Sequence, residues 1–305
     1  MLKTRKELIN ADRYQSHQGF AKRTLMPLAL FLIPAIASAQ STPSLKHRVF
    51  VHWGYNRAQF SASDIHFTGT DYNFILHQVV AKDKPEALAL NNYFNPKNFW
   101  IPQYNYRAGW FPNDQWSLSL GLDHMKYVME ADQVVQLTGQ ISRERSATYA
   151  TSADEGEVLL AADFLTYEHT DGLNLVALDA DHYTRLWHGA DGKQAVYFTQ
   201  GIFVGPVIPR TDVRLFGEGL NNKFHLAGYG AGAQVGIFAL FSDRIFLRAN
   251  LRAGYIELPS VLTTGKAKDR ADQHFWFVQE NVVVGVLIGR TKAGARAGSP
   301  STSPR

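Results

Sequence analysis

The fold is decided by residues 116–123, which have the sequence WSLSLGLD. Large apolar residues occupy every second position, and serine, glycine or aspartate occupies the positions between them. Successive side chains of a β-strand point to opposite faces, so this period of two predicts a strand with one apolar and one polar face. Residues 104–110, YNYRAGW, alternate in the same way, and residues 111–114, FPND, have the composition of a tight turn. Together the three segments predict a β-hairpin.

The same alternation returns toward the C-terminus. Residues 229–239 and 247–255 alternate on either side of a short turn at residues 242–244, and residues 276–289 close the series. In full, we expect ten strands, at residues 48–57, 99–111, 115–128, 158–168, 174–187, 194–206, 208–217, 223–241, 245–257 and 273–289.

The connections between these strands differ in length. Asp171-Gly172 fits a short turn on the periplasmic side, like the turns at residues 111–114 and 242–244. Residues 72–80 also resemble a strand, so eight or twelve strands remain possible. The long connections are residues 58–98, 129–157 and 258–272, and in a transmembrane barrel they would be the loops outside the cell. We expect the first two to contain hairpins that extend above the membrane.

Two all-β architectures produce alternating strands. In a soluble sandwich the apolar faces form the core, whereas in a transmembrane barrel they point to lipid and the polar faces line the interior. A tilted strand needs about 9 to 11 residues to cross a bilayer, which the strands here reach, whereas sandwich strands average about 5 to 6. Short turns alternating with long polar loops are also typical of outer-membrane barrels. We therefore expect a single antiparallel transmembrane β-barrel of about ten strands with long extracellular loops.

Aromatic residues at the ends of the apolar faces support the barrel. Transmembrane barrels carry aromatic girdles at both membrane–water interfaces. The predicted interfacial aromatics are Trp53, Tyr55, Tyr104, Trp110, Trp116, Tyr255 and Trp276. A soluble periplasmic β-domain, the alternative, would bury its tryptophans in a closed core.

Composition excludes other classes of protein. Mean hydropathy is −0.20, and after the first 39 residues no stretch approaches the about 20 apolar residues of a spanning helix. The absence of cysteine excludes disulfides, thiolate metal sites and a cysteine nucleophile. Six of the 31 basic and two of the 27 acidic residues lie in the first 39 residues, which leaves 25 of each in the remainder. That neutral remainder lacks the basic surface of a nucleic-acid-binding protein.

The N-terminus carries an export signal. Lys22 and Arg23 precede the apolar run LMPLALFLIPAI at residues 25–36, and small residues follow at Ala37 and Ala39. This order is that of a secretory signal peptide cleaved between Ala39 and Gln40, and the alternative is a membrane anchor or buried helix. We expect residues 1–39 to be the signal peptide, 40–47 a short lead, 48–290 the barrel and 291–305 a disordered tail.

Polar residues on the inward strand faces are candidates for the lumen lining. They are Arg107, Asp123, Arg248, Asn250, Arg252 and Asn281. The arginines could select anions in a pore. In a narrow barrel they more often pair with acids, here Asp123 and Glu280, and fill the interior. Glu280 has the parity of the lipid-facing valines, so its pairing requires a β-bulge or a different register.

No catalytic or metal site follows from the motifs. The chain has 11 histidines, but neither an H-E-x-x-H nor an H-x-H spacing, so we expect scattered rim and lumen histidines rather than a metal site. A membrane hydrolase would need a Ser-His-acid set or paired carboxylates at the rim. The segment FHLAG at residues 224–228 lacks the serine of the H-x-S-N pattern of lipid A deacylases. The catalytic residues stay unassigned, and no cofactor is expected.

Three segments carry a family resemblance. They are DHMKYV at residues 123–128, EHTDGLN at 168–174 and FHLAGYG at 224–230. They resemble an uncharacterised family of outer-membrane β-barrel proteins of Gram-negative bacteria, along nearly the whole of the chain after residue 39. The resemblance implies a barrel in the outer membrane and implies no activity or site.

The expected function is that of an outer-membrane barrel with a structural, adhesive or narrow-pore role. The first alternative is an outer-membrane lipid-modifying hydrolase, and the second is a soluble periplasmic β-domain. The expected partners are outer-membrane lipid and lipopolysaccharide, with the barrel assembly machinery during biogenesis, and no nucleic acid.

Overall fold

The computed structural model describes residues 43–87, 89–93, 95, 97, 102–219 and 223–289. The predicted signal peptide, with Ala37, Ala39 and Gln40, and the predicted tail at residues 291–305 lie outside the described residues. Among the described residues there is one short helix, α2 (Leu90–Tyr93). No helix in the described part of the chain is long and apolar enough to cross a membrane.

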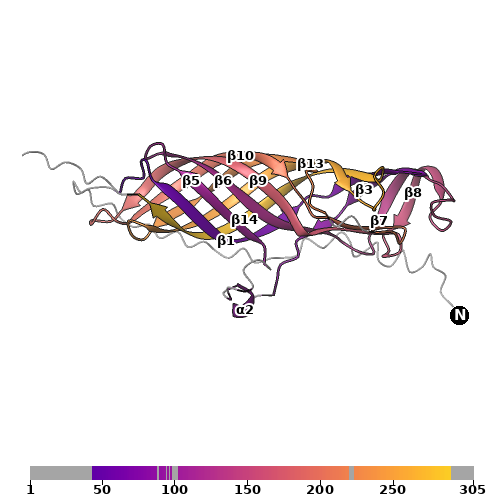
Figure 1. Ribbon diagram of the computed structural model, residues 1–305, viewed down its shortest axis with the longest axis horizontal. Helices are drawn as coiled ribbons and strands as arrows, with labels where there is room; N and C mark the ends of the chain where they lie inside the picture. The colour runs from indigo at the N-terminus through magenta and orange to yellow at the C-terminus, as the bar shows by residue number, and fades with distance from the viewer. Residues whose placement is uncertain are drawn as a thin grey trace, which may run out of the picture. The chain divides into compact units, whose positions relative to one another are not determined.

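Eight antiparallel strands close into a barrel (Figure 1). Each strand is hydrogen bonded to the next, and β1 closes the ring by pairing with β14 from Val49 opposite Ile288 to Phe60 opposite Phe277. The ring therefore has no free edge. In sheet order its strands are β1 (Val49–Phe60), β5 (Tyr104–Trp110), β6 (Trp116–Met129), β9 (Leu165–His188), β10 (Ala195–Val207), β12 (Gly228–Leu240), β13 (Ile245–Leu262) and β14 (Arg270–Ile288).

The ring has eight strands instead of the expected ten, and one cause is the length of β9. The predicted turn at Asp171-Gly172 is wrong, because β9 continues through these residues from Leu165 to His188. The register of β9 on β6 shifts between Met125 and Tyr127, and Gly172 adopts a φ of 131°. Glycine reaches this conformation without steric cost, so the dipeptide forms a β-bulge and not a chain reversal.

The second cause is the segment predicted as a strand at residues 208–217. Only β11 (Asp212–Leu215) is a strand there, and it pairs with Leu165–Glu168 of β9. The amides of Ile208 and Arg210 donate to the carbonyls of Asn174 and Gly172, so the segment continues the line of β10 along β9. This segment therefore does not contribute a separate strand to the ring.

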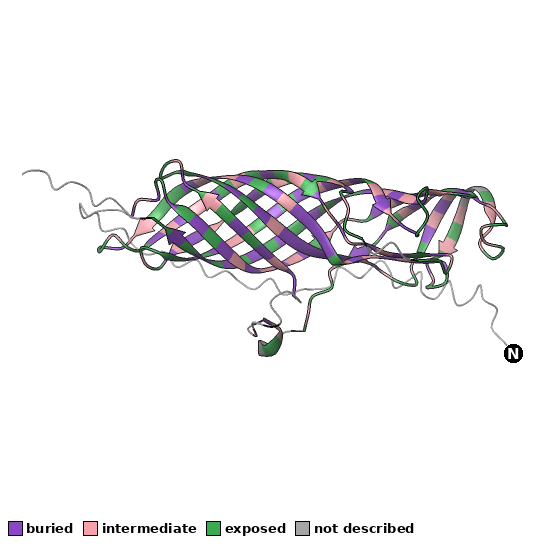
Figure 2. Ribbon diagram, in the orientation of Figure 1, coloured by how far each residue is buried: buried purple, intermediate pink, exposed green. Residues whose placement is uncertain are grey.

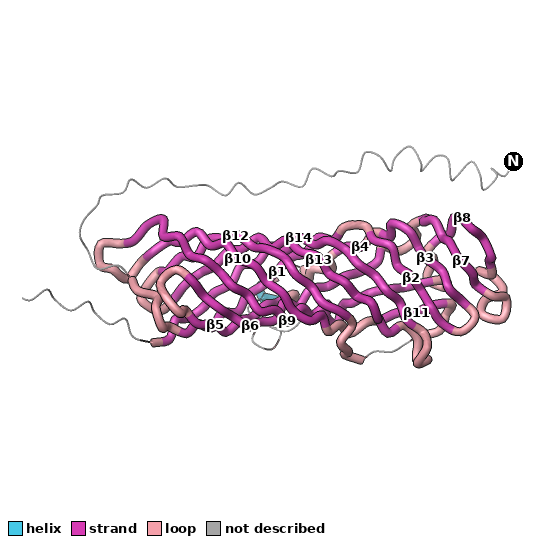
Figure 3. Tube along the Cα trace, turned by 90° about the horizontal axis from the view of Figure 1, so that it is seen from above, coloured by secondary structure: helices cyan, strands magenta, loops and turns pink. Residues whose placement is uncertain are grey.

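The end of the barrel that carries the long loops is prolonged by the ends of β6, β9, β13 and β14, together with the strands outside the ring. We call this part of the chain the distal extension. The extension comprises residues 61–82, 126–172, 208–227 and 256–275. Its additional strands are β2 (Ser63–Gly69), β3 (Tyr72–Val79), β4 (Ala81–Lys82), β7 (Val134–Ile141), β8 (Thr151–Leu159) and β11. From β14 the sheet continues in the order β2, β3, β7, β8 (Figure 3). The hairpins predicted within residues 58–98 and 129–157 are confirmed.

The outer face of the ring is apolar, which separates the barrel from the sandwich alternative. Along β14 buried and exposed residues alternate without interruption from Gln273 to Ile288 (Figure 2). The exposed set includes valines, leucines and isoleucines that a sandwich would bury. We call them the apolar belt: Val49, Val51, Leu118, Leu120, Leu178, Ile202, Val204, Val235, Leu247, Leu251, Val278, Val282, Val284, Val286 and Ile288.

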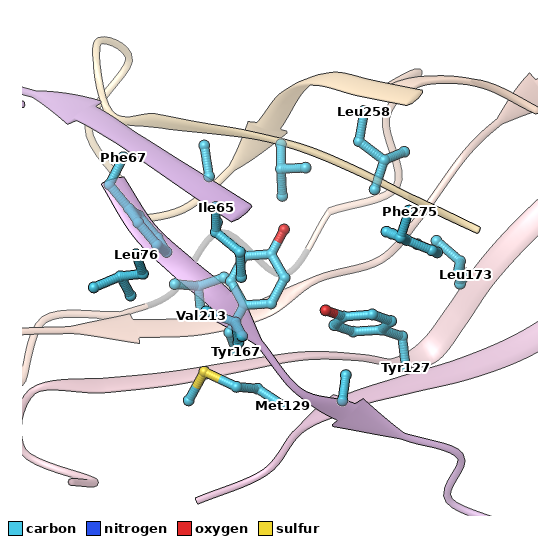
Figure 4. Close-up of a cluster of buried hydrophobic side chains, with 14 of the residues drawn as sticks. Ile65, Phe67, Leu76, Tyr127, Met129, Tyr167, Leu173, Val213, Leu258 and Phe275 are labelled. Atoms are coloured by element: carbon cyan, nitrogen blue, oxygen red, sulfur yellow. The ribbon is translucent and has the colours of Figure 1, made fainter. Parts of the chain in front are cut away.

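The interior of the ring is filled in layers, and the inward side chains of β13 show their order. Phe246 belongs to an apolar cluster at the end with the short turns, Arg248 and Arg252 follow, and Ile256 and Leu258 belong to a second apolar cluster. The second cluster extends into the distal extension, where Phe67, Tyr127, Tyr167, Val213 and Phe275 come together from five strands (Figure 4).

Candidate functional site

All six predicted lumen residues lie on inward faces in the middle layer of the barrel. Arg107, Asp123, Arg248, Arg252 and Asn281 are buried, and Asn250 is partly buried. The structure brings the three arginines together with three aspartates, which we call the charge cluster. Its members are Arg107, Asp123, Asp179, Asp181, Arg248 and Arg252.

Two arginines share two carboxylates at the centre of the charge cluster. Arg107 donates Nη1 to Asp123 Oδ1 at 3.1 Å and Nη2 to Asp123 Oδ2 at 2.7 Å. Its Nε lies 2.6 Å from Asp179 Oδ2, which also lies 2.8 Å from Arg252 Nη1. Arg252 Nη2 completes the ring of contacts at 3.3 Å from Asp123 Oδ2. The predicted pairing of lumen arginines with Asp123 is therefore present, through Arg107 and Arg252.

The third arginine is held beside this centre. Arg248 donates Nη1 to Asp181 Oδ2 at 2.9 Å and Nε to Asn250 Oδ1 at 2.8 Å. Gln234 links the two parts, since its Nε2 donates to Asp181 Oδ1 at 2.7 Å and to Asp179 Oδ2 at 3.2 Å. Three guanidiniums thus face three carboxylates, and the charge cluster is formally neutral.

Sequence reasoning missed Asp179 and Asp181. Both lie on β9, where they alternate with the outward-facing Leu178 and Ala180. The period of two within residues 174–187 carries this information, so applying the strand parity there would have placed both carboxylates in the lumen.

Glu280 is the predicted lumen acid that the structure places elsewhere. It is exposed on the outward face of β14, with Arg57 of β1 as its Cα partner. The register of β14 on β1 is continuous through this position, so neither a β-bulge nor a register change turns the side chain inward. The predicted lumen pairing of Glu280 is wrong.

Several lumen residues on the β1 and β14 side have no hydrogen-bond partner within the described residues. The two ring nitrogens of His52 are buried without a hydrogen-bond partner among the described residues. The same holds for the side-chain amide nitrogen and oxygen of Gln279 and of Asn281. Buried polar atoms of this kind are generally satisfied by internal water. Apolar clusters lie on either side of this polar layer.

The predicted interfacial aromatics all face outward. Trp110, Trp116 and Trp276 are exposed, and the other four are partly buried. Trp110 and Trp116 flank the short turn at residues 111–114, whereas Tyr255 and Trp276 pack against each other toward the opposite end, with ring centroids 5.2 Å apart. This placement fits two girdles, and their contact with a membrane interface stays a prediction.

A pocket of about 270 Å³ opens on the outward face where the apolar belt meets the distal extension. Strand β6 contributes His124, which stacks on Tyr104 with ring centroids 4.7 Å apart. We call it the rim pocket, and its lining is Tyr104, Leu122, His124, Asp171, Asn174, Val176, Ile208 and Phe224.

Hydrogen bonds fix the tautomer of the rim histidine. Asn174 Nδ2 donates to the backbone carbonyl of Ile208 at 3.1 Å, which leaves its Oδ1 as an acceptor. His124 Nδ1 lies 2.8 Å from that Oδ1 and is therefore the protonated nitrogen. A neutral His124 then presents Nε2 as a lone-pair acceptor beside the rim pocket.

The rim pocket contains a possible base but no hydroxyl nucleophile of the serine type. Its lining includes neither serine nor threonine. Among the described residues, no three histidine, aspartate or glutamate side chains gather as metal ligands. The pocket can accept hydrogen bonds at His124 and Asp171 and can contact an apolar chain at Leu122 and Val176.

The distal extension is held together by a clasp around Arg145. Its Nη1 lies 2.8 Å from Glu218 Oε2, and its guanidinium lies over the rings of Tyr72 and Phe216 at 5.5 and 5.2 Å. Lys266 contacts the same Glu218 oxygen at 3.1 Å. Hydrogen bonds from Arg145 and Lys266 hold the pKa of Glu218 below its usual value. The clasp joins the β7–β8 connection to the turn after β11.

Comparisons with known proteins give likenesses among solved structures only. No protein-family model and no curated protein matches the chain. The outer membrane protein OprG from Pseudomonas aeruginosa is 9% identical, with a TM-score of 0.39 over 82% of this chain and 99% of that one. Outer membrane protein AlkL in DMPC bilayers is 10% identical, with a TM-score of 0.37 over 87% and 99%.

Ail, the attachment invasion locus protein of Yersinia pestis, is 8% identical, with a TM-score of 0.26 over 78% of this chain and 99% of that one. In all three comparisons 99% of the solved chain is covered, against 78% to 87% of this chain. Their TM-scores lie below 0.5, so the barrel architecture is established by the strand pairings of the chain itself.

Proposed function

We propose that the protein is an outer-membrane β-barrel that is closed to solutes and presents its distal extension outside the cell as a binding surface. The observation that carries the proposal is the filled interior. Two apolar clusters enclose a neutral charge cluster, so ions and polar solutes meet no continuous aqueous path. The structural and adhesive roles are therefore favoured over the narrow pore.

The membrane location is supported by the outer surface. A closed sheet satisfies its backbone hydrogen bonds internally, and the apolar belt can contact hydrocarbon. Outer-membrane lipid and lipopolysaccharide would surround the belt, and the barrel assembly machinery would insert the chain. A soluble periplasmic domain would instead expose this belt to water.

Two measurements test the proposal. In unboiled outer-membrane fractions the protein should migrate faster on a gel than after boiling, as a folded barrel does. Purified protein added to planar bilayers should give no single-channel steps. A soluble periplasmic fraction of the protein, or regular conductance steps from the wild type, would contradict the proposal.

A lipid-modifying hydrolase is the second candidate, because His124 has a fixed tautomer next to the apolar belt. It has less support than the closed barrel, since the rim pocket contributes no serine or threonine. Mass spectra of lipid A from cells with and without the gene distinguish the two. A lost acyl chain that depends on His124 would favour the hydrolase.

A further inference from the structure

Strand β8 has the longest free edge among the described strands of the distal extension. β8 pairs with β7 and ends the path of the sheet, and no other described strand pairs with it. Every strand of the ring, in contrast, has a neighbour on both sides. The other edge strands, β11 and β4, have four and two residues, whereas β8 has nine. A short edge protects a sheet from pairing with other chains, and β8 lacks that protection.

Ladder geometry shows which backbone groups face the free edge. The Leu160 amide donates to the Gln133 carbonyl at 2.9 Å, so Leu160 is directed toward β7. Backbone direction alternates along an antiparallel strand, and the N–H groups of Leu159 and Glu157 therefore point away from β7. The Leu159 carbonyl accepts from the Ala161 amide at 2.8 Å, which agrees with this direction. Two amide donors thus face the free edge.

The side chains next to this edge combine charge with apolar surface. Glu157 is exposed, and the sequence of β8, TSADEGEVL, contains three acidic residues and no basic one. Leu159 and its cross-strand partner Val134 are 44% and 59% exposed on the outward face. Both lie in the distal extension, away from the apolar belt, so a surrounding bilayer does not account for their exposure.

We propose that β8 is a docking edge, to which an extended basic segment of another protein adds as one more strand. The main-chain hydrogen bonds would be made at Glu157 and Leu159, and strand addition of this kind is a general mode of peptide recognition. This proposal rests on the proposed function in one respect, namely that the distal extension faces the outside of the cell.

Charge selects the class of partner. A lysine or arginine on the added strand, opposite Glu157, would form a favourable cross-strand pair, and an aliphatic residue two positions away would cover Leu159. A second copy of this chain is a poorer partner, because pairing of β8 with β8 would bring together two strands that each contain three acidic residues and no basic one.

The probe is a blocked, dye-labelled peptide of nine residues, TKTVTKTVT, added to the full-length protein in neutral detergent. Its lysines and valines lie two positions apart on one face, so a lysine can face Glu157 while a valine covers Leu159. We expect saturable binding by fluorescence anisotropy, and slower hydrogen exchange at the amides of Glu157 and Leu159, by about tenfold or more at saturation. The same peptide with N-methylated edge-facing amides, and the same peptide with glutamate in place of lysine, should each bind about tenfold or more weakly.

Three variants separate backbone pairing from charge. Glu157→Pro removes an amide that faces the free edge, and it leaves the hydrogen bonds to β7 in place. It should therefore weaken binding of the lysine peptide by about tenfold. Glu157→Gln keeps the backbone amide but removes the charge. It should weaken binding of the lysine peptide by about two- to fivefold, and the remaining affinity should depend less on salt concentration. Glu144→Gln removes an exposed charge from the β7–β8 connection, off the edge, and should leave binding unchanged.

The proposal is overturned if N-methylation leaves the affinity unaltered, or if wild-type exchange at residues 151–159 does not slow on binding. The exchange measurement needs no variant and so does not depend on how Glu157→Pro folds. If the wild type forms dimers and Glu157→Pro does not, the proposal is overturned, because the occupant of the β8 edge is then a second copy of the chain. A protein that binds the peptide but gives conductance steps would contradict the proposed function alone. A protein that gives no conductance steps and does not bind the peptide would contradict this inference alone.

Discussion

At the scale of single residues, the charge cluster is both the most costly and the most specific part of the interior. Arg107, Arg248 and Arg252 are almost completely buried, and so are the three aspartates that they contact. Removing charges from water costs several kcal/mol per ion, and the attraction between them offsets that cost only when every partner is present. The loss of one member therefore costs more than the loss of a matched pair.

The pair formed by Asp181 and Arg248 tests this reasoning. Asp181→Leu and Arg248→Met should each lower the free energy of unfolding by about 3 to 5 kcal/mol, because each leaves an opposite charge buried. The double variant should lose less than either single variant. Urea titration of the refolded protein in lipid vesicles measures all three. Losses that simply add in the double variant would contradict the coupling.

The residues of the lumen were predictable where the strand parity was applied. Arg107 and Asp123 follow from the hairpin at residues 104–123, which the structure contains. The prediction for Glu280 is wrong because it followed the acidic character of the side chain. The strand parity of position 280 is that of the lipid-facing valines. The rim pocket was not predictable, because Asn174 and Ile208 meet His124 only through the bulge in β9 and the chain after β10.

Glu218 gives the distal extension a dependence on pH. Its pKa is lowered from an ordinary value of 4.5 by Arg145 and Lys266, so the carboxylate is favoured in the folded chain. The clasp should therefore be fully formed above about pH 4.5 and be lost as the pH falls through the lowered pKa. Hydrogen exchange of residues 142–150, corrected for the intrinsic effect of pH, should rise on acidification.

The matched variant is Glu218→Gln, which cannot ionise. Its exchange at residues 142–150 should already be faster than wild type at neutral pH, because Arg145 has lost its charged partner. Further acidification should then change it little. An acid-induced rise of equal size in Glu218→Gln and in the wild type would assign the effect to another group.

At the scale of elements, the bulge in β9 determines how the barrel continues into the distal extension. The bulge lets one strand of 24 residues pair with β6 on both sides of a register shift. A bulge bends a strand and increases its twist. The sequence at Asp171-Gly172 is equally suitable for a turn and for a bulge, and only long-range pairing with β6 and β11 decides between them. This is one of the two reasons why the sequence predicts ten strands where the ring has eight.

Gly172 carries that bulge. Gly172→Ala should lower the free energy of unfolding by about 1 to 3 kcal/mol, because its φ of 131° is strained for any residue with a Cβ. An added Cβ would also lie 2.4 Å from Asn174 Nδ2. Gly265→Ala is the control, since its Cβ would meet nothing within 4 Å, and it should change stability by less than about 0.5 kcal/mol. Equal losses in the two variants would mean that the bulge does not depend on glycine.

At the scale of the whole barrel, the two ends differ in the length of their connections. The turns at residues 111–115, 189–194 and 241–244 join ring strands at one end, and the strands of the distal extension emerge at the other. Transmembrane barrels place short turns in the periplasm and long segments outside. This asymmetry predicts the orientation of the protein in the membrane without reference to any other protein.

Epitope tags inserted at the two ends test that orientation. A tag after Ala147 lies in the connection between β7 and β8, and a tag after Asp191 lies in the turn between β9 and β10; both positions are exposed and outside the strands. Antibody should label the first tag on intact cells and the second only after the outer membrane is permeabilised. Insertions at exposed turns rarely disturb a fold, and heat-dependent gel migration confirms that each tagged barrel has formed. Labelling of the Asp191 tag on intact cells would mean that the short turns face outward, and the edge of β8 would then lie in the periplasm, where no extracellular partner could reach it.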